Sequence, residues 1–148
     1  MPDGAERPQD PFVVACVPAF NEEGSIAGVV VQARKYVDRV VVCDDGSRDL
    51  TGAIAEGLGA VVIRHEGNMG KGAALNSSFR YVKDLKPGIV VVLDADGQHD
   101  PSEIPRLVEP IVGGAADLSS TEGSHATWQG CQAAGVLLRG GARPLAGS

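Results

Sequence analysis

The strongest constraint on the fold comes from residues 89–93, an unbroken aliphatic run of Ile, Val, Val, Val and Leu. Such a run, mostly β-branched, is typical of a strand covered on both faces, as in parallel sheets flanked by helices. The chain becomes acidic immediately afterwards, at Asp94 and Asp96. Because ligands of open parallel sheets bind beyond the carboxyl ends of the strands, these carboxylates stand where a binding site is expected.

Three similar runs precede this one, at residues 12–17, 39–43 and 60–64, and each is predicted to be a buried strand. Helical patterns separate the runs: apolar residues recur every three or four positions over 26–37, and another helix is expected over 73–85. A short helix near Thr51, a helix after Pro101 and a fifth strand starting within 115–118 complete the expected elements. This alternation predicts a doubly wound α/β domain, in which the loops after the strands meet at one rim.

The acids after residues 89–93 are the first candidates for a metal site. Residues two apart on an extended chain point to the same side, so Asp94 and Asp96 can converge on one ion. Ligation by oxygen alone favours Mg²⁺ or Mn²⁺, with Gln98 as a neutral oxygen donor. The alternative interpretation is an acidic turn in which Asp100 or Ser102 caps the next helix, with Ser102 as the expected cap.

Two adjacent acids, Asp44 and Asp45, end the second predicted strand. They repel each other there, so we expect a ligand that supplies hydrogen-bond donors, such as the ring N–H of uracil or guanine, or ribose hydroxyls. For the nearby Ser47 and Asp49, capping of the following helix is the better interpretation.

Other polar residues near the strand ends have simpler interpretations. Asn21 is expected to cap the helix that follows it, with Glu22 and Glu23 suited to the positive helix end. Lys71, at the start of the third helix, opposes the helix dipole, and this placement favours a bound anion. A solvated lysine beside a flexible glycine-rich turn is the alternative for Lys71.

Composition narrows the classes of partner and location. A net charge of −6 without a basic cluster argues against nucleic acid as a partner. Of three cysteines, Cys16 and Cys43 lie in predicted strands, as expected for core residues in a reducing compartment. Neither a signal-peptide pattern nor an apolar run of about 18 residues is present. We therefore expect a cytoplasmic protein without a transmembrane segment, for which contact with the cytoplasmic membrane face stays open.

Four segments together resemble the ordered motifs of family 2 glycosyltransferases. They are residues 18–23 (PAFNEE), 44–47 (DDGS, followed by Asp49 and Thr51), 68–72 (NMGKG) and 94–101 (DADGQHDP). The likeness is greatest to the branch of dolichol-phosphate mannosyltransferases and polyprenyl-phosphate glucosyltransferases. Four motifs in register over residues 12–118 are far more specific than any one of them.

The resemblance implies a GT-A fold that transfers a hexose with inversion from GDP-mannose or UDP-glucose to an acceptor such as a polyprenyl or dolichyl phosphate. It also implies Mg²⁺ or Mn²⁺ held on the diphosphate by Asp94, Asp96 and Gln98, with the two aspartates as the catalytic residues that help the diphosphate to leave. Asp44 or Asp45 would meet the base or ribose. The other implied donor-binding residues are Pro18, Ala19, Phe20, Asn21, Glu22 and Lys71.

The motifs also suggest boundaries. Residues 1–11 are expected to be disordered, 12–118 to form a partial GT-A domain, and 119–148 to be a low-complexity tail that is disordered or non-native. We therefore hypothesise a truncated or frame-shifted glycosyltransferase that carries the donor-binding half. A catalytically silent nucleotide-sugar-binding fragment and a sugar-phosphate nucleotidyltransferase stay open, although the latter usually has a basic glycine-rich loop where residues 18–23 are acidic.

Overall fold

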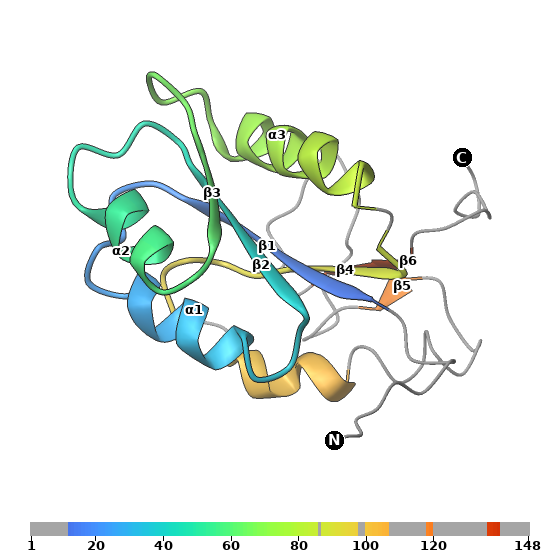
Figure 1. The fold of residues 1–148 in the computed structure, drawn as a ribbon. Helices are drawn as coiled ribbons and strands as arrows, with labels where there is room; N and C mark the ends of the chain where they lie inside the picture. Colours follow the sequence, from blue (N-terminus) through green and yellow to red (C-terminus); the bar gives the residue numbers. More distant parts are fainter. Residues whose placement is uncertain (1–11, 86, 98–99, 107–117, 120–135, 140–148) are drawn as a thin grey trace.

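The computed structural model of the chain describes residues 12–85, 87–97, 100–106, 118–119 and 136–139. Its elements are β1 (Val13–Ala19), α1 (Ile26–Ala33), β2 (Arg39–Asp44), α2 (Thr51–Gly57), β3 (Val61–Arg64), α3 (Lys71–Lys83), β4 (Ile89–Val92), the 3₁₀ helix η1 (Pro101–Glu103), β5 (Leu118–Ser119) and β6 (Val136–Arg139). One sheet contains the strands in the order β3-β2-β1-β4-β6-β5 (Figure 1). Strands β1 to β4 pair in parallel, which confirms the predicted α/β class with a mainly parallel sheet.

Helices cover both faces of the parallel strands, which explains why these strands are mainly apolar. Figure 1 shows α1 and α2 on one face of the sheet and α3 on the other. Alternate residues of β1 serve the two faces: Ala15 and Val17 join the core beneath α1, whereas Val14 and Cys16 join the core beneath α3. Because full burial of a valine contributes roughly 1.5–3 kcal/mol, β1 anchors both layers.

The strand order changes direction at β1. The chain first places β2 and β3 on one side of β1, and then returns through α3 to place β4 on the other side. Two hydrogen bonds hold the segment after β4 in place: Leu93 N donates to Cys16 O at 3.0 Å, and Ser25 Oγ donates to Ala95 O at 2.6 Å. The carboxyl ends of β1 and β4 therefore lie together at a topological switch point, where ligands of such sheets bind.

The far edge of the sheet differs from the prediction. A fifth strand is found at Leu118–Ser119, the end of the expected range, but Val136–Arg139 also forms a strand, antiparallel to β4. These four residues lie within the segment 119–148 that the sequence led us to expect as a tail, and the limits of that segment stay a prediction. A four-residue run carries too little pattern to be recognised alone, because its backbone groups find partners only when the strand pairs with β4 and β5. The expected segment 1–11 lies outside the described residues, as do residues 120–135 and 140–148 of the expected segment 119–148, so the domain boundaries stay predictions.

The helix caps need three corrections. The residue at the N-cap of α1 is Ser25 rather than Asn21, and its side chain makes no capping hydrogen bond. At η1 the N-cap is Asp100 rather than Ser102: Asp100 Oδ1 accepts from Ser102 N at 2.9 Å. At α2 the N-cap is Leu50 rather than Ser47 or Asp49, and no side chain makes a capping hydrogen bond there, although Asp49 Oδ1 accepts from Thr51 N at 3.0 Å.

The two cysteines of the central strands are core residues, as predicted. Cys16 and Cys43 are free thiols with no exposed surface. Burial raises the pKa of Cys16 to about 12, and burial together with the charges of Asp45 and Asp44 raises the pKa of Cys43 to about 11. Since the thiolate is the nucleophile, neither cysteine is suited to covalent chemistry. In the ranges that the structure describes, no helix has the length and apolar character to span a membrane.

Candidate functional site

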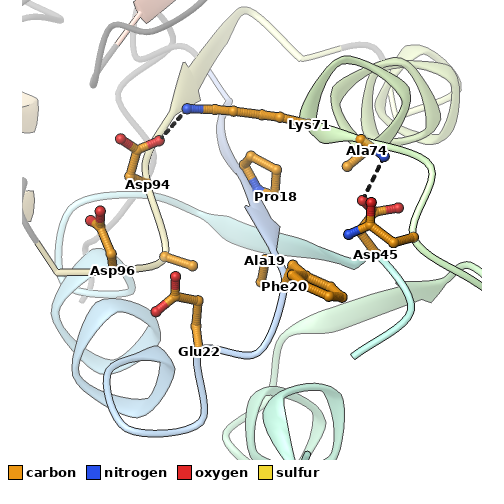
Figure 2. A pocket seen from close by; sticks show the side chains of 12 residues that line it. Pro18, Ala19, Phe20, Glu22, Asp45, Lys71, Ala74, Asp94 and Asp96 are labelled. Atoms are coloured by element: carbon orange, nitrogen blue, oxygen red, sulfur yellow. Dashed lines mark hydrogen bonds and ion pairs between the residues drawn. The ribbon is translucent and has the colours of Figure 1, made fainter. Parts of the chain in front are cut away.

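A pocket with a volume of about 400 Å³ opens at the carboxyl ends of β1 and β4 (Figure 2). This volume lies in the range of about 300–1,000 Å³ that is usual for small-molecule sites. The lining residues come from the ends of β1, β2 and β4 and from the start of α3. They are Pro18, Ala19, Phe20, Glu22, Asp45, Asn68, Gly70, Lys71, Ala74, Asp94, Ala95 and Asp96.

The end of β1 and the turn after it supply the middle of the pocket. Pro18 and Ala19 are buried, whereas Phe20 keeps 43% of its surface exposed and offers an aromatic ring to a ligand. Asn21 does not line the pocket: it has a φ of 53°, and its Oδ1 accepts from Arg48 N at 2.9 Å. The structure therefore gives Asn21 a place in the packing between two turns, while Glu22 does reach the pocket.

The structure separates the two acids that end β2. Asp44 is buried and does not line the pocket; its Oδ1 accepts from Ser47 N at 2.9 Å. A Cβ added to Gly52 would lie 2.5 Å from Asp44 Oδ2, so this carboxylate packs tightly against the first turn of α2. Asp45 lines the pocket. Adjacent residues of an extended chain point to opposite sides, which is why one acid is structural and its neighbour faces the site.

Asp45 is held by donors from the chain itself. Its Oδ1 accepts from Met69 N at 2.9 Å and its Oδ2 from Gly70 N at 2.8 Å. A third bond joins Oδ1 to His65 Nδ1 at 2.7 Å. The donors that the sequence analysis expected from a ligand are therefore partly supplied by the glycine-rich loop, which the carboxylate ties to the end of β2.

The protonation of Asp45 is set by two opposed effects. Burial raises the pKa of Asp45, but the hydrogen bonds from His65, Met69 and Gly70 outweigh burial and lower the pKa below its ordinary value. A carboxyl whose pKa is lowered on folding stabilises the protein above its unfolded pKa of about 4, and this contribution is lost as pH falls through the lower folded value.

We expect Asp45→Asn to be less stable than the parent protein by about 2 kcal/mol at pH 7, because a neutral amide has one acceptor oxygen for three donors. The difference in free energy of unfolding should shrink as pH falls from about 5 to about 2, where the parent carboxyl takes up its proton. Urea unfolding across this pH range measures the difference. A constant difference would show that the charge of Asp45 contributes nothing to stability.

On the opposite side of the pocket, Asp94 and Asp96 follow β4. Figure 2 shows both carboxyl groups on the same side of the pocket, with Glu22 nearby. Lys71, the first residue of α3, reaches across so that its Nζ lies 2.8 Å from Asp94 Oδ1. The anion that the sequence predicted beside Lys71 is, in this structure, the carboxylate of Asp94. Lys71, Asp94 and Asp96 line the same pocket.

The donor set tests whether a metal fits here. Gln98 lies outside the described residues. Within the described ranges, no three His, Cys, Asp or Glu side chains are grouped so that they can hold a metal by themselves. Mg²⁺ in nucleotide sites is usually bound by one or two carboxylates together with substrate phosphates and water. Asp94 and Asp96 therefore fit a metal site that a diphosphate completes, rather than a cage made only of protein ligands.

One residue near the site was missed by the sequence analysis. His65 follows β3 directly, its side chain is 9% exposed, and it bonds Asp45. The rule that singled out the acids after β2 and β4, namely polar residues at the carboxyl end of a strand, also applies to His65. Asn68 lines the pocket from the loop; it belongs to the motif 68–72 but was given no role. Ala74, which lines the pocket from α3, carried no comparable signal.

An open, mainly parallel sheet with an acidic pocket at its switch point is typical of α/β proteins that bind nucleotides. The family follows from comparison with known sequences: residues 14–125 match the profile described as Glycosyl transferase family 2. The chain belongs to this family, and the resemblance of its four motifs is confirmed.

Among the relatives are uncharacterised proteins and enzymes whose names include dolichyl-phosphate or undecaprenyl-phosphate. The chain is 40% identical over 109 residues to an uncharacterised protein of Methanocaldococcus jannaschii, covering 73% of this chain and 44% of that protein. It is 33% identical to UDP-N-acetylglucosamine–dolichyl-phosphate N-acetylglucosaminyltransferase of Methanococcus voltae, covering 70% of this chain and 48% of that protein. The chain thus spans about half the length of these relatives or less.

A solved structure supports the fold. Glucosyl-3-phosphoglycerate synthase from Mycobacterium tuberculosis, in complex with Mn²⁺, UDP-glucose and phosphoglyceric acid, is 32% identical and superposes with a TM-score of 0.60. The match covers 70% of this chain and 40% of that chain. The GT-A type of α/β fold expected from the motifs is therefore confirmed, over the part of the fold that this chain represents.

Proposed function

We propose that this chain carries the donor site of a metal-dependent inverting glycosyltransferase, which transfers a hexose from GDP-mannose or UDP-glucose to a polyprenyl or dolichyl phosphate. The observation that carries the proposal is the pocket itself. Asp45 lies on one side of it, Asp94 and Asp96 lie on the other, and Lys71 reaches from the start of α3 to Asp94. This spacing of unlike groups suits a ligand with a hydrogen-bonding base at one end and a charged diphosphate at the other.

The nucleoside end is assigned to Asp45 and Phe20. An ionised carboxylate has about four acceptor positions, and among the described residues three donors reach Asp45. One position is left for the ring N–H of uracil or guanine, or for a ribose hydroxyl. The exposed ring of Phe20 offers a face on which a base can stack.

The diphosphate end is assigned to Asp94, Asp96 and Lys71. Asp94 and Asp96 would hold Mg²⁺ or Mn²⁺, and a bound metal supplies positive charge that stabilises the departing diphosphate. Lys71 stands at the start of a helix of 13 residues, where free backbone N–H groups favour anions. Its ammonium group, paired with Asp94 in this structure, can also contact a phosphate oxygen within the same pocket.

The acceptor is proposed from the names of relatives, which include a polyprenol monophosphomannose synthase of Mycolicibacterium smegmatis, 32% identical and covering 67% of this chain and 40% of that protein. A phosphate monoester has a second pKa of about 6, so its oxygen is largely ionised near neutral pH. Such an acceptor needs little help from a general base. This matters because no residue of the pocket is assigned that role.

We expect calorimetric titration with UDP, GDP, UDP-glucose and GDP-mannose to show that the protein binds either the two uridine nucleotides or the two guanosine nucleotides. Binding should weaken strongly when Mn²⁺ is removed with a chelator. No heat with any of the four ligands would refute a donor site. Binding without transfer to a polyprenyl phosphate would favour the silent nucleotide-binding fragment. Pyrophosphate release from a nucleoside triphosphate and a sugar phosphate would instead favour a nucleotidyltransferase, a class against which the family match argues.

A further inference from the structure

A nearly buried chain of polar side chains runs behind the nucleoside end of the pocket. His65, at the end of β3, lies with Nδ1 2.7 Å from Asp45 Oδ1 and with Nε2 2.8 Å from Ser77 Oγ of α3. Cys43 Sγ of β2 is 3.7 Å from the same Nε2. Both ring nitrogens therefore have partners: Asp45 and Cys43 at the end of β2, and Ser77 of α3.

The chemistry of the partners fixes the role of each nitrogen. An ionised carboxylate only accepts hydrogen bonds, so Nδ1 of His65 carries a proton and donates it to Asp45. The Ser77 hydroxyl then bonds Nε2 and prevents the ring from turning. With Oδ1 engaged by His65 and Met69, the bond from Gly70 N to Oδ2 sets the plane of the carboxylate. These bonds fix the orientation of the remaining acceptor position of Asp45, which lines the pocket.

We propose that His65 is a positioning residue for the nucleotide base or ribose: it orients the Asp45 carboxylate and, through it, holds the Met69–Gly70 backbone against the pocket. This inference rests on the proposed function. Without the ring, Asp45 keeps two backbone donors that both belong to the glycine-rich loop, so its carboxylate loses the side-chain bond that ties it to the end of β3. The backbone bond from His65 N to Asp44 O, at 2.9 Å, stays in place. Asp94 and Asp96 lie across the pocket from this arrangement.

Two substitutions separate the ring nitrogens. The amide nitrogen of asparagine reaches about as far as Nδ1, so His65→Asn keeps a donor for Asp45 and gives up Ser77. The amide of glutamine reaches about as far as Nε2, so His65→Gln keeps Ser77 and gives up Asp45. We expect His65→Gln to raise the Kd for UDP or GDP about tenfold, the usual effect of losing a hydrogen bond to a charged group, and His65→Asn to stay within about threefold of the parent.

The ratio of Kd values without and with Mn²⁺ should be the same in the parent and in both variants, because the proposed metal ligands are untouched. A general loss of folded protein would weaken nucleotide binding by both variants alike, including His65→Asn. If His65→Gln binds the nucleotide within about twofold of the parent, or if both variants weaken binding equally, the positioning role is refuted.

Amide hydrogen exchange gives a second measurement that needs no ligand. The amides of Met69 and Gly70 should exchange about tenfold faster in His65→Gln than in the parent, and at nearly the parent rate in His65→Asn. Unchanged exchange in His65→Gln would overturn the inference. If the parent binds no nucleotide, the proposed function fails, whereas the exchange rates still decide whether His65 positions Asp45 and its loop.

Discussion

Asp96→Ala is expected to abolish the Mn²⁺ dependence of nucleotide binding. The loss of an outer partner of a metal ligand already costs about 10- to 100-fold in metal affinity, and the loss of a direct ligand should cost at least as much. The structure sharpens this expectation, because the described residues contain no cluster of three His, Cys, Asp or Glu ligands that would retain the ion without Asp96. Calorimetric titration with and without Mn²⁺ measures the effect.

Asp84→Ala is the matched control for Asp96→Ala. Asp84 is exposed at the C-terminal end of α3 and does not line the pocket, so its replacement removes the same charge elsewhere. We expect the control to keep the Mn²⁺ dependence of the parent protein. If Asp96→Ala also keeps it, Asp96 is not a metal ligand, and the proposed role of the acids after β4 is wrong.

Gly46→Ala should strongly destabilise the fold, because two backbone segments meet at Gly46. Its φ of +78° is a left-handed conformation that costs other residues about 1–2 kcal/mol. A Cβ there would also lie 2.4 Å from the carbonyl carbon of Gly67, and overpacking adds about 1–3 kcal/mol. We expect a total loss of about 2–5 kcal/mol in the free energy of unfolding, measured by urea denaturation.

Gly28→Ala is the matched control for Gly46→Ala. Gly28 lies on the exposed side of α1, and a Cβ there meets nothing within 4 Å. Because alanine favours the helix over glycine, this variant should be more stable than the parent by up to about 1 kcal/mol. If Gly46→Ala were as stable as Gly28→Ala, the close contact between the turn after β2 and the loop at Gly67 would not exist in solution.

Gly46→Ala should also weaken nucleotide binding. The clash pushes Gly67 and Asn68 away, and these residues precede the amides that hold Asp45. A variant that loses stability but binds the nucleotide as the parent does would show that the loop can move without disturbing Asp45. That result would also argue against the positioning role of His65.

Local patterns predicted the elements that position the site. The mainly apolar runs at 12–17, 39–43 and 89–93 correspond to β1, β2 and β4, in which every residue except Arg39 is buried. The stripe that begins at Ile26 corresponds to α1, although the helix ends at Ala33 and leaves Val37 outside. These predictions succeed because burial on one or both sides of an element leaves a period in the sequence itself.

The side-chain contacts within the site left no such periodic pattern in the sequence. Both Asp44 and Asp45 were plausible ligands, and only the paths of α2 and of the glycine-rich loop decide that one is packed and the other faces the pocket. Lys71 was expected near an anion, but the partner found is Asp94, 23 residues away along the chain. His65 gained its importance only when β3 was placed beside β2.

The sequence alone determined that this chain forms a parallel sheet between helices, that acids follow two of its strands, and that its motifs are those of family 2 glycosyltransferases. These properties depend on residues close to one another in the chain, where periodicity and spacing record them. The tertiary structure decided which acid reaches the pocket, which cation faces which carboxylate, and that residues 136–139 complete the sheet. Those outcomes depend on contacts between distant segments, because hydrogen bonds and ion pairs form only after the core has fixed where each strand ends.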